Sequence, residues 1–73
     1  MAEGLRNRLH ALRADHGLTQ AALAEQVGVS RKTINTIENG VFVPSTVLAL
    51  RLARALERPV EGIFSLDDDG QEN

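Results

Sequence analysis

Five polar residues recur at helical spacing near the middle of the chain: Arg31, Lys32, Asn35, Thr36 and Asn39. Residues three or four positions apart lie on one face of a helix, so these side chains would point the same way. In the major groove of B-DNA, Arg and Lys donate to guanine, Asn pairs with adenine, and Thr contacts the thymine methyl group. The same residue types also occur on solvated helix faces, but at the start of a helix that enters the groove they favour contact with DNA.

Two predicted helix starts add groups that bind phosphate. Gln20 and Ser30 each lie at the beginning of a predicted helix, where backbone N–H groups have no partner within the helix. The partial positive charge of such a terminus attracts anions. Contacts of this kind fix the position of a protein on a duplex without reading its sequence.

Five helices are predicted to position these groups, over residues 3–16, 20–26, 31–39, 46–57 and 60–64, with no β-strand. Leu5, Leu9 and Leu12 recur as on the buried side of a helix. The N-cap residues are Thr19, Ser30 and Ser45, and Gly17, Gly28 and Gly40 follow the first three helices. Pro59 fits the first turn of the last helix.

The second and third predicted helices have the features of a helix-turn-helix. Ala24 is small where the two helices approach each other, and Gly28 permits a sharp turn between them. Ile34 and Ile37 would bury one side of the third helix. The polar residues described above would then face outward.

Residues 19–40, TQAALAEQVGVSRKTINTIENG, resemble the Cro and phage-repressor type, or XRE-like, helix-turn-helix family. The resemblance continues through Pro44, Ser45 and residues 48–64, and it is closest to short stand-alone regulators. It implies an all-α, five-helix, lambda-repressor-like DNA-binding domain over residues 1–66, with the helix-turn-helix at the second and third helices.

The resemblance also assigns roles to individual residues. The matching base-reading positions are Ser30, Arg31, Lys32, Asn35 and Thr36, and the phosphate-positioning ones are Thr19, Gln20 and Asn39. Gln20 would also support the start of the recognition helix. Arg13 and Glu38 match a pair that forms a partly buried, structural salt bridge. Val41, Phe42 and Val43 stand where family members often carry basic or polar residues, so contacts from that loop would depend on main-chain amides and Asn39.

The composition argues against several other classes of protein. The chain has 73 residues and a net charge of −2. It has no Cys, and this absence excludes disulfides and zinc fingers. It has no signal-peptide core and no apolar run long enough to cross a membrane, so we expect a cytoplasmic protein. His10 and His16 lack a third ligand, and no catalytic group stands beside a base. We therefore expect no metal, cofactor, small-molecule ligand or enzymatic activity.

Charge is unevenly distributed along the chain. Residues 1–40 carry a small excess of basic groups, whereas residues 41–73 are acidic and include Asp67, Asp68 and Asp69. The first half is therefore the better candidate for DNA binding. Residues 67–73 are predicted to be a disordered acidic tail that weakens non-specific DNA binding by repelling phosphate.

A surplus of apolar residues follows the helix-turn-helix: Val47, Leu50, Ile63, Phe64 and Leu66. They either cover the core or form a two-fold interface. A homodimer is favoured, because a single module of this size rarely binds DNA tightly and paired half-sites supply avidity.

The sequence therefore predicts a transcriptional regulator that binds double-stranded DNA, more readily a repressor than an activator because occlusion needs no further contact surface. Two alternatives remain open. One is a protein-interaction module, such as the antitoxin of a toxin–antitoxin pair. The other is the DNA-binding half of a longer regulator.

Overall fold

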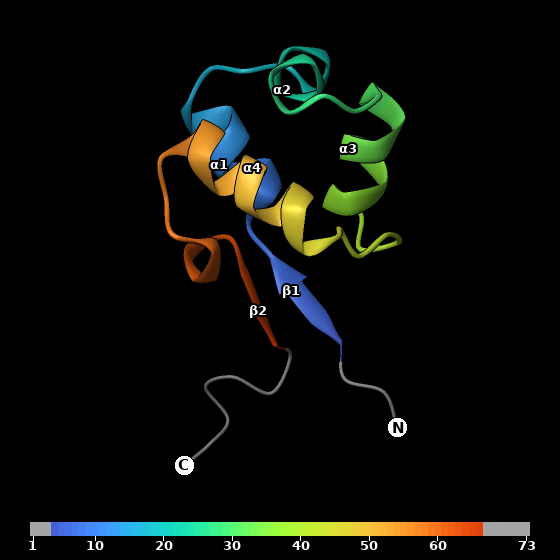
Figure 1. Cartoon of the computed structure of the whole chain (residues 1–73), viewed down its shortest axis with the longest axis vertical. Helices are drawn as coiled ribbons and strands as arrows, with labels where there is room; N and C mark the ends of the chain where they lie inside the picture. The colour runs from blue at the N-terminus through green and yellow to red at the C-terminus, as the bar shows by residue number, and fades with distance from the viewer. Residues whose placement is uncertain (1–3, 67–73) are drawn as a thin grey trace.

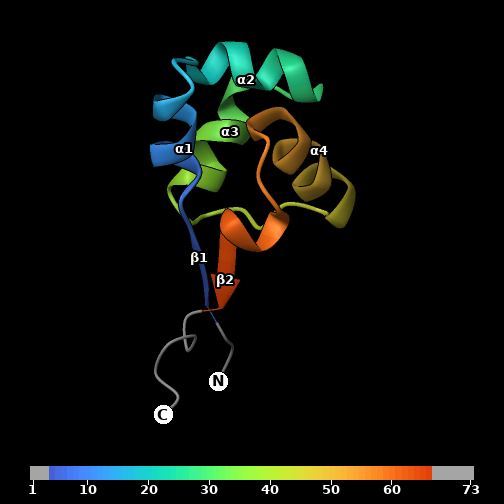
Figure 2. The same ribbon diagram turned by 90° about the vertical axis from the view of Figure 1, so that its left-hand side faces the viewer.

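The computed structural model describes residues 4–66, which form four α-helices and a two-stranded sheet (Figure 1). The elements are β1 (Leu5–Asn7), α1 (Leu9–Asp15), α2 (Gln20–Val27), α3 (Arg31–Glu38), α4 (Thr46–Leu56), the 3₁₀ turn η1 (Val60–Gly62) and β2 (Phe64–Leu66). The helices pack together at one end, and both strands extend from the other (Figures 1 and 2). The predicted acidic tail lies outside the described residues.

Residues 4–8 do not form the first turns of a helix, as the sequence predicted. β1 instead pairs antiparallel with β2, with Leu5 opposite Leu66 and Asn7 opposite Phe64. The prediction of five helices and no strand is therefore wrong. Each strand has only three residues, and pairing between distant segments leaves no periodic signal within either one.

Asn7 and Arg8 mark the point where the extended chain enters α1. Asn7 Oδ1 accepts a hydrogen bond from the Leu9 N–H (3.1 Å), and Asn7 Nδ2 donates to the Ile37 carbonyl on α3 (3.1 Å). The Arg8 N–H donates to the Ile63 carbonyl (2.8 Å). Because Asn side chains readily satisfy backbone groups at helix starts, they favour a helix that begins here.

The helix-turn-helix predicted at the second and third helices is confirmed as α2 and α3. Thr19 Oγ1 caps α2 by accepting from the Ala22 N–H (3.0 Å), and Ser30 Oγ caps α3 by accepting from the Thr33 N–H (3.1 Å). Gly28 follows α2 with φ of +77°, in the left-handed region that suits glycine. The turn can therefore be short.

The chain after α4 differs from the prediction. Ser45 Oγ caps α4 by accepting from the Leu48 N–H (3.1 Å), and the helix ends before Glu57, which adopts the left-handed conformation. The helix predicted for residues 60–64 is reduced to η1, and Phe64 already belongs to β2. Pairing with β1 replaces the helical hydrogen bonds.

An aliphatic core lies beneath the helix-turn-helix. Its buried members come from all four helices and the residue after η1: Leu9, Leu12, Leu23, Ala24, Val27, Ile34, Ile37, Leu48, Leu52, Ala53, Leu56 and Ile63. Ile34 and Ile37 attach α3 to this core. The opposite face of α3 is thereby held outward.

Candidate nucleic-acid interface

The outward face of α3 carries the polar side chains singled out in the sequence. Ser30, Arg31, Lys32, Asn35 and Asn39 are exposed, whereas Thr36 is partly buried. The Thr36 hydroxyl donates to the Thr33 carbonyl within α3 (2.9 Å). The face therefore offers a guanidinium, an ammonium and amide groups to a partner, while the Thr36 hydroxyl hydrogen is already in use.

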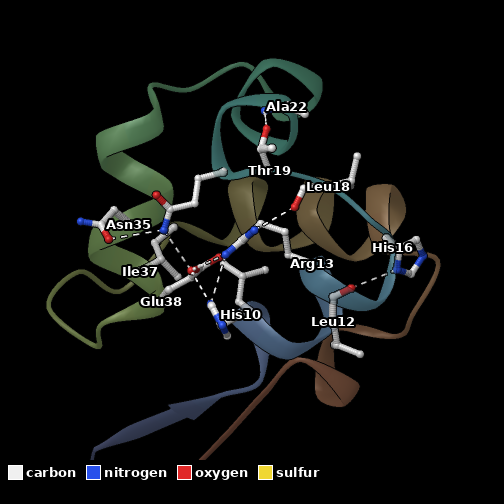
Figure 3. Close-up of polar contacts among 12 residues, drawn as sticks. His10, Leu12, Arg13, His16, Leu18, Thr19, Ala22, Asn35, Ile37 and Glu38 are labelled. Atoms are coloured by element: carbon white, nitrogen blue, oxygen red, sulfur yellow. Dashed lines mark hydrogen bonds and ion pairs between the residues drawn. The ribbon is translucent and has the colours of Figure 1, made fainter.

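An ion pair connects α1 with the end of α3. Arg13 Nε lies 2.6 Å from Glu38 Oε2, and Arg13 Nη2 lies 3.3 Å from Glu38 Oε1. The exposed fractions of the two side chains are 12% for Arg13 and 4% for Glu38. Arg13 Nη1 also donates to the Leu18 carbonyl (2.8 Å). Figure 3 shows Arg13 reaching from α1 toward Glu38, with the salt bridge expected from the sequence in place.

Gln20 continues this set of contacts from α2 to α3. Its Nε2 donates to Glu38 Oε1 (3.1 Å) and, over a longer distance, to Asn35 Oδ1 (3.4 Å). Asn39 Nδ2 donates to the same Asn35 oxygen (3.2 Å). Gln20 therefore connects the buried ion pair with an exposed residue of the recognition face.

Glu38 stays ionised through its partners. Burial raises the pKa of Glu38, but hydrogen bonds from Arg13 and Gln20 outweigh it, with a smaller contribution from His10 and from the charge of Arg13. The pKa consequently lies below its ordinary value of 4.5. The hydrogen bond to Glu38 in turn raises the pKa of Arg13, against the effect of burial.

The two histidines lie at different ends of α1. His10 Nδ1 lies 3.2 Å from Glu38 Oε1 and 3.1 Å from Arg13 Nη2, at the exposed edge of the ion pair. His16 follows the last turn of α1, with Nδ1 3.1 Å from the Leu12 carbonyl. His10 thus contacts residues of both α1 and α3, and His16 contacts the backbone of α1.

Arg6 of β1 and Arg8, which precedes α1, lie beside the end of α3, a position that the sequence analysis did not predict. Arg6 and Arg8 line a hollow with Asn39 and Gly40, beside the end of α3. The prediction placed both arginines on a helix, where their relation to Asn39 could not be seen. In the structure Arg6 pairs with Ser65 of β2, and the Arg8 N–H donates to the Ile63 carbonyl before β2.

One of the five residues predicted to form a dimer interface, Ile63, does not lie on the surface. Val47 and Leu50 are 59% and 54% exposed, and Leu66 is also exposed. Ile63 is 1% exposed and belongs to the core, because its position after η1 turns it inward. Phe64 is partly buried and lines an apolar groove with Leu50 and six others: Leu5, Val43, Pro44, Thr46, Ala49 and Val60.

Residues 9–63 match the family model described as helix-turn-helix. The chain therefore belongs to the helix-turn-helix family of DNA-binding transcriptional regulators, of the Cro and phage-repressor (XRE) type. This is a family of regulators and not of enzymes.

Two relatives, one from an archaeon and one from a bacterium, match over almost their entire length. An uncharacterized HTH-type transcriptional regulator from Methanothermobacter thermautotrophicus is 51% identical, covering 90% of this chain and 97% of the relative. The HTH-type transcriptional regulator YgzD from Bacillus subtilis is 40% identical, covering 89% of this chain and 98% of its own length.

Solved structures of regulators share the fold. The restriction-modification controller protein C.AhdI from Aeromonas hydrophila is 36% identical, with a TM-score of 0.72, covering 75% of this chain and 83% of C.AhdI. The clp gene regulator ClgR from Corynebacterium glutamicum is 34% identical, with a TM-score of 0.69, covering 73% of this chain and 56% of ClgR.

Across residues 4–66, no helix is long and apolar enough to cross a membrane.

Proposed function

We propose that the chain represses transcription by binding DNA as a homodimer, with α3 of each copy in successive major grooves of an operator. The main support is the exposed polar face of α3, where Arg31, Lys32 and Asn35 point outward while Ile34 and Ile37 attach the helix to the core. A recognition helix of this kind contacts base edges with its N-terminal residues. Occlusion of a promoter needs no additional surface, so repression is the simplest mode of regulation.

The proposed contacts divide into base reading and positioning. Ser30, Arg31, Lys32, Asn35 and Thr36 read bases. Thr19, Asn39 and the backbone N–H of Gln20 contact phosphate, together with the other first backbone amides of α2 and α3. Arg6 and Arg8 add positive charge beside Asn39. Phosphate contacts set the register on the duplex, and base contacts set the sequence.

The dimer interface is proposed on the apolar surface formed by Val47, Leu50, Phe64 and Leu66. Three of these side chains are exposed, and Phe64 borders the groove beside Leu50. Ile63 supports this surface from inside the core and does not itself contact the second copy. A stable interface would bury at least about 1,000 Å² in total.

Selection of binding sites from a random duplex library, at about 0.1–0.15 M salt, tests the proposal. An inverted repeat with half-sites about one helical turn apart is expected, because two recognition helices related by a two-fold axis require that spacing. A single unrepeated half-site would contradict the dimer but not DNA reading. Weak, salt-sensitive binding without an enriched motif would contradict sequence-specific recognition.

One observation favours a second candidate, the DNA-binding half of a longer regulator. A putative HTH-type transcriptional regulatory protein from Pyrococcus horikoshii is 40% identical over 53 residues, which are 17% of that protein.

In either case the site of action is the chromosome, so we place the protein on nucleoid DNA in the cytoplasm. An antitoxin role would require a partner protein and would be tested by co-purification with one.

A further inference from the structure

The acceptor atom of Asn35 is already occupied inside the protein. Its Oδ1 accepts from Gln20 Nε2 (3.4 Å) and from Asn39 Nδ2 (3.2 Å). An amide oxygen has two lone pairs, and both are engaged here. Among residues 4–66, the amide nitrogen of Asn35 has no acceptor, so its two hydrogens remain for a ligand.

The charge of Glu38 determines which way these amides point. An ionised carboxylate only accepts hydrogen bonds, so the Gln20 atom that faces it must be the amide nitrogen. The same nitrogen faces Asn35, which must therefore present its oxygen. Asn39 then has to present its nitrogen to that oxygen. Arg13 holds the Glu38 carboxylate in place from α1.

This arrangement changes which base Asn35 fits. Asn recognises adenine through two bonds, donating to N7 and accepting from the N6 amino group. With Oδ1 occupied, the second bond to adenine is lost. Guanine instead presents two acceptors, N7 and O6, in the major groove.

We infer that Asn35 reads DNA as a hydrogen-bond donor only and selects guanine over adenine at its base pair. The inference rests on the proposed function, in which α3 enters the major groove. Gln20, Asn39 and Glu38 are positioning residues in this scheme, because they act on the base through Asn35. The expectation from residue type alone, that Asn pairs with adenine, is replaced by the opposite preference.

The first experiment compares motifs selected by the wild-type protein and by Asn35→Ala. The base pair at which Asn35→Ala loses preference is the one that Asn35 reads, and guanine is expected there in the wild-type motif. Adenine at that position, or no position-specific change, would overturn the inference while leaving DNA binding intact. Failure of the wild-type protein to enrich any motif would instead refute the proposed function, and the inference with it.

Variants that release the Asn35 oxygen provide the second experiment. Asn39→Ala frees one lone pair on an exposed surface, and Glu38→Gln removes the charge that orients Gln20. Each should reduce the preference for guanine over adenine about three- to tenfold at that position. A lost phosphate contact would lower affinity for all sequences alike. Gln26→Ala removes an exposed amide of α2 and serves as the matched control, with an unchanged motif.

Base analogues test the donor geometry directly, without relying on the stability of a variant. Replacing the guanine by 7-deazaguanine removes the N7 acceptor and should weaken wild-type binding about tenfold. Inosine keeps both N7 and O6 and should bind as guanine does. Asn35→Ala should not distinguish 7-deazaguanine from guanine. Equal wild-type affinity for the two would contradict the inference, as would an unchanged guanine preference in both Asn39→Ala and Glu38→Gln.

Discussion

Glu38 connects three helices through one carboxylate. It belongs to α3, binds Arg13 of α1 and accepts from Gln20 of α2. These contacts fix the orientation of the recognition helix relative to the helices behind it. The family resemblance implied the ion pair and a supporting role for Gln20 at the start of the recognition helix. It gave no sign that Gln20 engages Asn35, since that contact depends on the folded distance between α2 and α3.

Breaking this ion pair should destabilise the fold. Arg13→Ala leaves the Glu38 carboxylate 4% exposed without its main partner, and we expect a loss of about 2–3 kcal/mol in unfolding free energy. Urea denaturation measures it. His10→Ala removes a largely exposed contact and should change stability by less than about 0.5 kcal/mol.

A double-mutant cycle identifies the cause of that loss. The loss of stability in the Arg13→Leu/Glu38→Leu variant should be smaller than the sum of the losses in the two single variants. Each single variant leaves one buried charge without its partner, whereas the double variant has no charge at either position. Additive losses would show that the two side chains do not stabilise the fold through each other.

The ion pair also predicts how stability depends on pH. The folded-state pKa of Glu38 is lowered from 4.5, so its contribution is present above the unfolded-state pKa and is lost as pH falls through the lower, folded-state value. The unfolding free energy of the wild-type protein should therefore fall more steeply below about pH 4.5 than that of Glu38→Gln. Urea titrations between about pH 3 and pH 6 compare the two, and superimposable profiles would contradict the prediction.

Arg31 and Lys32 test the reading face itself. Arg31→Ala should weaken operator binding by about 1–3 kcal/mol and relax base choice at one position. Lys32→Ala should affect a different position or the salt dependence of binding. Fluorescence anisotropy with the selected operator and single-base variants measures both effects. If neither substitution changes operator affinity, the face of α3 assigned to the bases is wrong.

At the scale of helices and strands, local signals predicted α2, α3 and α4 well. Thr19, Ser30 and Ser45 each cap a helix with their own side chain, and such contacts lie within three residues of the cap. The strands had no equivalent signal. Leu5 fits the spacing of Leu9 and Leu12, yet pairing with β2 places it in a strand.

The end of α4 offers a test of helix capping. Glu57 adopts φ of 57°, a left-handed conformation that disfavours residues with a Cβ atom. Glu57→Gly should therefore stabilise the protein by about 0.5–1 kcal/mol, since glycine is the usual residue at this position. Thermal or urea unfolding measures the change. Glu57→Ala retains the Cβ atom and is the control; equal stability of the Gly and Ala variants would contradict the explanation.

At the scale of the whole molecule, the fold separates two kinds of surface. The polar face of α3 is supported by the core and by the Glu38 contacts, whereas the apolar surface combines α4 with β2 and the groove beside them. The sequence predicted that both surfaces exist. It left open whether Ile63 covers the core or joins an interface, and the structure places Ile63 in the core.

Dimerisation through the apolar surface predicts that one charge placed on this surface prevents dimerisation while leaving the binding of a single DNA half-site intact. Leu50→Glu should convert the protein to a monomer in sedimentation or light scattering, because a carboxylate would be buried without a partner. Its affinity for a full inverted repeat should fall about a hundredfold as avidity is lost, while its affinity for one half-site stays near the wild-type value. Ala14→Glu places the same charge on an exposed position of α1 and should leave both properties unchanged. A Leu50→Glu protein that remains dimeric would move the interface to another surface, and one that loses half-site binding as well would point to a damaged fold, which circular dichroism would reveal.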